Sequence, residues 1–382
     1  MVTDQIIMDN QQDDIRALLK DSGESTLERA IAKAKEVVDR LENITLNIAV
    51  TGETGAGKSS FVNAIRGLQE PDEGAAPTGV TETTMEPTMY PHPNMPNVKI
   101  WDLPGIGSPT FKAQTYMNDV NYQNYDFFII VSASRFKEDD MMLANEIKKE
   151  KKNFYFVRTK TDFDVANEKR KGVTEEETLQ KIRKDCVDNL RTLGFPPVFL
   201  ITSHNLEKFD FQTLVKTLER DLPEYKRDAL VMSLPVNSKE TLETKCITFM
   251  GLIWVVALIS YFIPSLFTEH DVVVYFLTKW YYSFGLDDEK VQKLSDRVNK
   301  PILRKVKESA LVRVIAEESL PTTEGVAKPG VAGVMEALCS LVPAAANTAS
   351  YGVLENKAVL LQEGLKELYS VAKMVIEMAE LK

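Results

Sequence analysis

A phosphate-loop motif constrains the fold of this chain more than any other feature of its sequence. Gly52–Ser59 matches the pattern G-x-x-x-x-G-K-[ST]. It follows the apolar stretch Leu46–Val50, which predicts a buried strand, and precedes Ser60–Ile65, which predicts the start of a helix. Such a unit wraps backbone N–H groups around a polyphosphate, because glycine tolerates left-handed turns and close approach. Lys58 would then reach the β- and γ-phosphates, and the Ser59 hydroxyl would hold Mg²⁺.

Two further motifs disfavour the alternative of an ordinary glycine-rich turn. The predicted strand Val98–Trp101 ends in Asp102–Gly105, where a carboxylate suits a water-mediated contact with Mg²⁺ and a glycine suits sensing of the γ-phosphate. Another predicted strand leads into Thr159–Asp162, an [NT]-K-x-D run. The aspartate of such a run would accept two N–H bonds from guanine, and the lysine stem would cover the ring. Since adenine offers no such pair of donors, the motif favours GTP over ATP.

The alternation of strand and helix patterns predicts an α/β domain. Phe127–Val131 and Val198–Ile201 are near-continuous apolar runs, as expected for a mostly parallel, doubly wound sheet covered on both faces. We expect a Ras-like P-loop GTPase domain over residues 45–232. Residues 1–44 and 233–382 are predicted to be helical, and 355–382 form an amphipathic pattern. The small-residue segment 325–352 predicts no particular conformation.

The sequence resembles the immunity-related GTPases, the interferon-inducible, dynamin-like resistance GTPases of vertebrates. The segments that carry the resemblance are Gly52–Ser60, Gly74–Thr84, Trp101–Gly107, Tyr155–Lys160 and Leu222–Arg227. It is close over about residues 45–235 and looser over the C-terminal third. Lys58 is typical of the members that keep the standard lysine. The resemblance implies that the terminal segments form one helical body, with residues 11–43 packed against 240–382.

The motifs and the resemblance together imply a set of nucleotide-contacting residues. They are Glu53, Thr54, Gly55, Ala56, Gly57, Lys58, Ser59, Ser60, Thr78, Gly79, Asp102, Gly105, Thr159, Lys160, Asp162 and Ser203. Ser59, Thr78 and Asp102 are expected to hold Mg²⁺. Thr78 or Thr84 is expected to close over the γ-phosphate.

The group that orients the attacking water is not evident from the motifs. Ras-type hydrolysis uses a glutamine just after D-x-x-G, but Ile106 stands there. The resemblance implies that Glu82, together with Lys58 and Ser59, acts catalytically in a dimer formed across the nucleotide faces. Glu53 and Arg135 are candidates for that interface. A solvated loop acid remains the alternative for Glu82, and a surface charge for Arg135.

Composition and net charge restrict the kinds of partner that we expect for this protein. The net charge of −10 argues against nucleic acid and against simple attraction to anionic lipid. Three widely spaced cysteines indicate neither a disulfide framework nor a zinc site, which suits the cytosol. No signal peptide is evident, and Val2 after Met1 does not fit an N-myristoylation motif.

Ile247–Thr268 is an uncharged stretch of 22 residues, long enough to span a bilayer. A helix buried in the helical body, a membrane-inserting helix and a true span all remain open. The resemblance implies peripheral attachment to the endoplasmic reticulum, the Golgi or a pathogen vacuole, with self-association and related GTPases as partners. The sequence thus predicts a GTP-hydrolysing protein of cell-autonomous immunity that oligomerises on such membranes. A nucleotide-gated cytosolic scaffold with slow turnover is the alternative.

Overall fold

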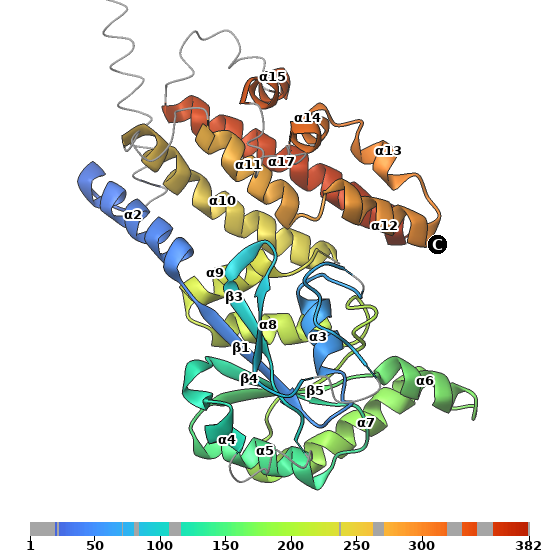
Figure 1. Cartoon of the computed structure of the whole chain (residues 1–382). Helices are drawn as coiled ribbons and strands as arrows, with labels where there is room; N and C mark the ends of the chain where they lie inside the picture. Colours follow the sequence, from blue (N-terminus) through green and yellow to red (C-terminus); the bar gives the residue numbers. More distant parts are fainter. Residues whose placement is uncertain are drawn as a thin grey trace, which may run out of the picture. The chain divides into compact units, whose positions relative to one another are not determined.

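A computed structural model describes residues 20, 23–70, 72–79, 84–106, 116–236, 238–262, 271–318, 331–341 and 354–380. The chain divides into two compact units (Figure 1). The sheet unit is Ile44–Leu234, and the helical unit combines Met1–Asn43 with Pro235–Lys382.

The sheet unit is built on one six-stranded sheet with the order β2-β3-β1-β4-β5-β6. The strands are β1 Leu46–Gly52, β2 Thr88–His92, β3 Met95–Asp102, β4 Phe127–Ser132, β5 Asn153–Arg158 and β6 Val198–Leu200. All neighbouring pairs are parallel except β2 with β3, which is antiparallel. The predicted mostly parallel, doubly wound sheet is therefore confirmed.

Helices cover both faces of this sheet because successive residues of a buried strand point to opposite sides. Ile48 and Val50 of β1 join a core with α3 (Lys58–Ile65), α8 (Phe211–Asp221) and α9 (Glu224–Ser233). Between them, Ala49 faces a second core with residues of three other helices. These are α4 Tyr116–Asp119, α5 Glu138–Lys149 and α7 Glu175–Leu190.

Parallel pairing brings the motif-bearing loops to one edge of the sheet. Val50 of β1 stands opposite Asp102 of β3, and Gly52 stands opposite Val131 of β4. Ser132 of β4 is in register with Arg158, after which the chain turns into α6 (Thr161–Lys169). The loops after β1, β3 and β5 therefore lie together at the carboxyl ends of their strands, the usual ligand-binding edge of such a sheet.

The helical unit is formed from both ends of the chain. Its helices are α2 Leu27–Asn43, α10 Lys239–Phe262, α11 Asp271–Ser283, α12 Asp288–Val298, α13 Ile302–Val306, α14 Ala310–Glu318, α15 Val331–Leu341 and α17 Leu354–Glu380. Ala30 and Ala34 of α2 pack against Val255, Ala257 and Leu258 of α10. The segment 325–352 contains α15, and its remaining residues lie outside the described ranges.

Helix α10 packs against α2, α11 and α17. Within the described residues, one helical stretch, Lys239–Leu258, is long and apolar enough to cross a membrane, but 56% of it is buried inside the protein. Ile247 is an exposed large hydrophobic residue of this stretch, with 73% of its surface exposed. Residues 263–268 of the predicted apolar stretch lie outside the described ranges. A core helix and a membrane span have the same apolar composition, so composition does not separate them. The packing of α10 against other helices favours the buried-helix alternative.

Lys245 on α10 is a buried cation within the helical unit. It is fully buried, and its Nζ donates to the Ser283 carbonyl at 2.8 Å and to the Ser283 hydroxyl at 2.9 Å. Loss of solvent lowers the pKa of Lys245 well below its usual value, and the nearby charge of Lys290 acts in the same direction.

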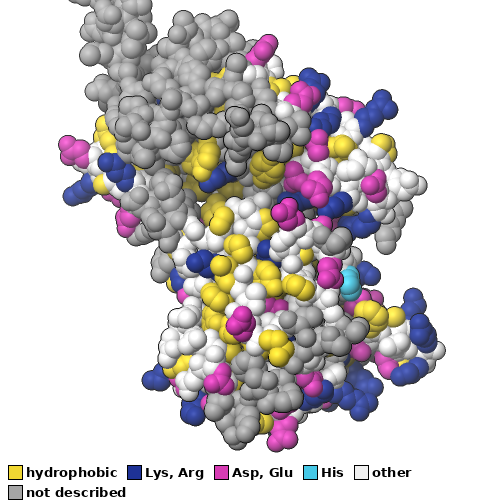
Figure 2. Space-filling model, in the orientation of Figure 1, with side chains coloured by type: hydrophobic (Ala, Val, Ile, Leu, Met, Phe, Trp, Pro, Cys, Tyr) yellow, Lys and Arg dark blue, Asp and Glu magenta, His cyan; other side chains and the backbone are white. Residues whose placement is uncertain are grey.

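On the face shown in Figure 2, acidic and basic side chains are interspersed.

Candidate functional site

The loop between β1 and α3 has the backbone geometry of a phosphate cradle. Gly52, Gly55 and Gly57 all have positive φ, at 139°, 79° and 88°. A Cβ on Gly52 would lie 2.0 Å from the Val131 carbonyl oxygen, so no other residue fits there without displacing β4. Gly57 caps the N-terminus of α3, which directs free N–H groups and the positive end of the helix dipole at an anion.

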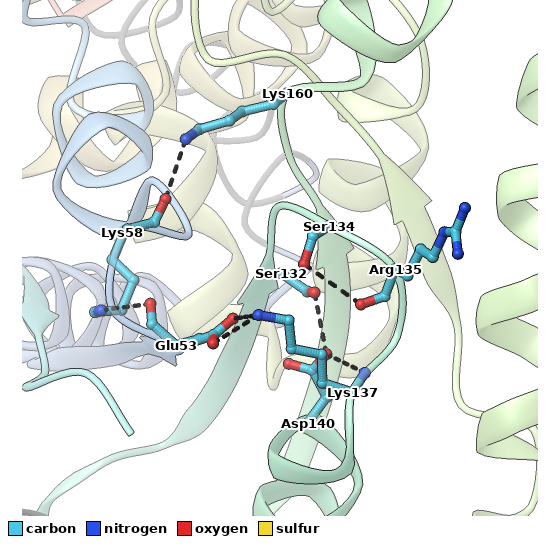
Figure 3. Close-up of polar contacts among 9 residues, drawn as sticks. Glu53, Lys58, Ser132, Ser134, Arg135, Lys137, Asp140 and Lys160 are labelled. Carbon is cyan, nitrogen blue, oxygen red and sulfur yellow. Dashed lines mark hydrogen bonds and ion pairs between the residues drawn. The ribbon is translucent and has the colours of Figure 1, made fainter. Parts of the chain in front are cut away.

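A pocket of about 130 Å³ opens over this loop. Its lining residues are Thr54, Gly55, Gly57, Lys58, Ser59, Ser60, Thr78, Gly79, Thr84, Gly105 and Lys160. The set draws together the loops after β1, β3 and β5 and the segment before β2. Lys58 is 93% buried, and its Nζ donates to the Glu53 carbonyl oxygen at 3.1 Å (Figure 3).

Two residues that line the pocket, Ser59 and Thr84, form a cluster of oxygen atoms with Asp102 at the end of β3. Ser59 donates to Asp102 Oδ2 at 2.6 Å, and Thr84 donates to the same oxygen at 3.0 Å. Asp102 is 1% exposed, and its Oδ1 has no hydrogen-bond partner among the described residues. Burial raises the pKa of Asp102, although its contacts with Ser59, Lys58 and Thr84 partly oppose that rise. A buried carboxylate oxygen beside two hydroxyls fits the ligand preference of Mg²⁺.

Thr78 lines the pocket but is not part of that cluster. Its N–H donates to one oxygen of Glu70 at 3.0 Å, and its hydroxyl donates to the other. The segment before Thr78 is fixed on α3, because the Asn63 amide donates to the Ala76 carbonyl at 2.8 Å and accepts from its N–H at 2.7 Å. Of the two threonines considered for the γ-phosphate, Thr84 is the one in contact with Asp102. Glu82 lies outside the described residues.

The predicted base-recognition residues lie beside the phosphate loop. The Thr159 hydroxyl donates to the Ala56 carbonyl at 2.7 Å, and Lys160 Nζ donates to the Gly55 carbonyl at 3.1 Å (Figure 3). Asp162 lies in the first turn of α6, and its Oδ1 is buried with no hydrogen-bond partner among the described residues. An unsatisfied buried acceptor fits a ligand that donates N–H groups. Ser203 is half-buried in the turn after β6 and is not part of the pocket lining.

The Glu53 side chain is turned away from the phosphate site. Its carboxylate accepts two hydrogen bonds from Lys137, at 2.7 and 2.6 Å, in the loop before α5 (Figure 3). Asp140 holds that loop by accepting from the Lys137 N–H and the Ser132 hydroxyl, both at 3.1 Å. Arg135 lies on the same loop. The sequence motifs gave no signal for Lys137 or Asp140, since both contacts depend on how the two loops meet.

Gly105 and Ile106 lie directly on the phosphate loop. A Cβ on Gly105 would come 2.2 Å from Thr54 Oγ1 and 2.8 Å from the Thr54 nitrogen. The Ile106 N–H donates to the Gly52 carbonyl at 3.1 Å, while its side chain is 2% exposed within the core shared with α4, α5 and α7. Ile106 therefore faces away from the pocket as well as lacking a polar group.

Residues 11–341 match the family model described as Interferon-inducible GTPase (IIGP). The chain belongs to this family. It is 39% identical over 323 residues to Interferon-inducible GTPase 5 of Rattus norvegicus, covering 81% of this chain and 70% of that protein. It is 43% identical over 272 residues to Interferon-inducible GTPase 1 of Mus musculus, covering 68% and 66%. The resemblance seen in the motifs is confirmed, and the protein is an immunity-related GTPase that binds GTP and GDP and hydrolyses GTP.

Proposed function

We propose that this immunity-related GTPase turns over GTP slowly as a single chain and faster when copies self-associate through their nucleotide faces. The observation that carries the proposal is the position of Ile106. Its side chain is buried in the core where a Ras-type enzyme has the water-orienting glutamine, so that residue cannot polarise the nucleophile. The group that orients the water must therefore come from elsewhere.

We assign the phosphates and the metal to residues at the start of α3 and at the end of β3. Lys58 is the buried cation at the phosphate loop, suited to the β- and γ-phosphates. Ser59 and Asp102 would hold Mg²⁺, with Thr84 or Thr78 completing the set when the loop closes. When bound, Mg²⁺ would neutralise charge that develops on the phosphate oxygens. Gly105, which lines the same pocket, would donate its N–H to the γ-phosphate.

Guanine would bind between the loop after β5 and the phosphate loop. The unpaired acceptor of Asp162 supports this assignment, because the guanine edge offers two N–H donors. The contact of Lys160 with Gly55 lays the lysine stem beside the loop, where it would cover one face of the ring.

Glu82 is our candidate for the water-orienting group, acting in a dimer with a second copy or a related GTPase of the family. Glu53, which is half-buried, and Arg135, which is exposed, are candidates for the same interface. In the free chain the Glu53 carboxylate is engaged by Lys137, so that ion pair would have to rearrange for Glu53 to contact a partner.

We further propose that assembly occurs on intracellular or pathogen-containing membranes, with the protein otherwise cytosolic and peripherally attached. The exposed Ile247 on a helix of high apolar content supports contact with lipid through the helical unit. A nucleotide-gated cytosolic scaffold is the second candidate, favoured by the burial of most of α10.

Turnover per molecule, measured over a dilution series with and without liposomes, separates the two. Self-association predicts turnover that rises steeply with protein concentration, and Glu82→Ala should lose that rise while keeping nucleotide affinity. Flat, slow turnover and failure of the GTP-loaded protein to float with liposomes would favour the scaffold.

A further inference from the structure

Tyr116 connects the phosphate loop with the D-L-P-G loop through two buried hydrogen bonds. It is the first residue of α4 and is fully buried. Its hydroxyl donates to the Pro104 carbonyl at 2.9 Å and lies 2.6 Å from the Thr51 hydroxyl. Thr51 directly precedes Gly52, and Pro104 directly precedes Gly105, so one phenol contacts the residue before each of these two glycines, through a side-chain hydroxyl at Thr51 and a backbone carbonyl at Pro104.

The donor in each of these two hydrogen bonds can be assigned by counting protons. A carbonyl only accepts, and a phenol has a single O–H, so Tyr116 donates to Pro104 and Thr51 donates to Tyr116. Burial raises the pKa of Tyr116, so the phenol keeps the proton that it donates. Thr51 is also fully buried, so water does not compete for these bonds.

The bond to Pro104 fixes the direction of the next N–H. The Pro104 carbonyl and the Gly105 N–H belong to one planar peptide unit, in which the two groups point in opposite directions when the bond is trans. The carbonyl points into the core shared with α4, where Tyr116 lies. The Gly105 N–H is consequently directed away from that core, on the side where Gly105 lines the pocket.

The flanking backbone prevents this peptide from rotating freely. Leu103 N–H donates to the Val50 carbonyl at 3.0 Å, and Ile106 N–H donates to the Gly52 carbonyl at 3.1 Å. Between these anchors, the Tyr116 hydroxyl holds the Pro104–Gly105 unit from the core side, and Thr54 of the phosphate loop limits it on the other.

We propose that Tyr116 is a positioning residue for GTP, whose hydroxyl aims the Gly105 N–H at the terminal phosphate. This rests on the nucleotide site assigned above. Because GDP lacks that phosphate, Tyr116 should contribute to GTP binding and hydrolysis and contribute little to GDP binding.

The test compares two buried tyrosines that undergo the same substitution. Tyr125 lies in the same core, is 3% exposed, and donates to the Val120 carbonyl at 2.9 Å, away from the pocket. Dissociation constants for GDP and for a non-hydrolysable GTP analogue are measured with Mg²⁺ on the full wild-type chain, Tyr116→Phe and Tyr125→Phe. Tyr116→Phe should weaken binding of the analogue by about tenfold, because a misdirected Gly105 N–H would lose its hydrogen bond to the charged terminal phosphate. The affinity for GDP should stay within about twofold.

Tyr125→Phe should keep the wild-type ratio of the two affinities. A wild-type ratio in Tyr116→Phe, or an equal loss for both nucleotides, would overturn the positioning role. If Tyr116→Phe does not fold, the Gly105 amide resonance of the wild type decides: it should move between the GDP and analogue complexes, and an unmoved resonance refutes the proposal. A wild-type chain that binds neither nucleotide would instead refute the assigned site.

Discussion

Replacing Gly105 by alanine should slow GTP hydrolysis strongly while leaving GDP binding nearly unchanged. An added Cβ would lie 2.2 Å from Thr54 Oγ1 and 2.8 Å from the Thr54 nitrogen, and real Cβ contacts essentially never fall below 3.0 Å. The hydroxyl can rotate away, but the backbone nitrogen cannot. The D-L-P-G loop must therefore withdraw from the phosphate loop by several tenths of an ångström or more.

A misplacement of about 1 Å in such a site can reduce the rate about 100-fold, so we expect Gly105→Ala to lower single-turnover hydrolysis about 10- to 100-fold. GDP affinity should stay within about twofold, because we assign Gly105 to the terminal phosphate, which GDP lacks. The assay is single-turnover hydrolysis at saturating GTP, with GDP titrations in parallel.

Two further variants sharpen this test. Gly251→Ala on α10, where a Cβ would meet nothing within 4 Å, controls for the substitution itself and should hydrolyse GTP like the wild type. Thr54→Ala combined with Gly105→Ala removes the hydroxyl but keeps the backbone clash, so it should restore only part of the rate. Wild-type hydrolysis by Gly105→Ala would refute the close approach of the two loops.

Three other predictions concern separate features. Lys58→Ala should abolish tight GTP binding and hydrolysis without unfolding the helical unit, as a nucleotide titration and circular dichroism would establish. Asp162→Asn should raise acceptance of xanthine nucleotide relative to guanine, because an amide presents one acceptor and a mismatched donor; an unchanged GTP/XTP affinity ratio would contradict it. The lowered pKa of Lys245 means that the unfolded chain binds its proton more tightly than the folded one. The free energy of unfolding should therefore rise with pH up to the usual pKa near 10.5, by at most about 1.4 kcal/mol per unit, and urea titrations of Lys245→Met should lack that component.

The parallel sheet was predictable in large part because β4 and β6 are buried on both faces and read as continuous apolar runs. Strand β2 was not predicted. Pro91 lies within it, and proline cannot donate to a sheet ladder, so the sequence reads as part of a loop. The structure accommodates Pro91 because β2 is the edge strand.

The motifs located the site only in part. The phosphate loop, Asp102 and Asp162 have fixed local patterns, and the structure brings their loops to one edge of the sheet. Tyr116, Glu70 and Lys137 have no such pattern, because each acts through a contact with a distant segment. Lys137 is 84 residues from Glu53, and Tyr116 is 65 residues from Thr51, so neither contact leaves a periodic signal.

Composition alone also left the apolar stretch after Lys245 ambiguous between a membrane span and a core helix. What distinguishes them is the partner that covers the helix. Much of that cover comes from α2, more than 200 residues earlier in the chain, and from α17 near its other end.

The split origin of the helical unit has a consequence for synthesis on the ribosome. The sheet unit is one continuous segment, Ile44–Leu234, and can fold as soon as it has emerged. The helical unit cannot, because α2 is made first and α17 is the last helix described. Until α17 emerges, α10 should expose the apolar face that α17 covers. The protein should therefore depend most on chaperones while α10 has emerged from the ribosome and α17 has not.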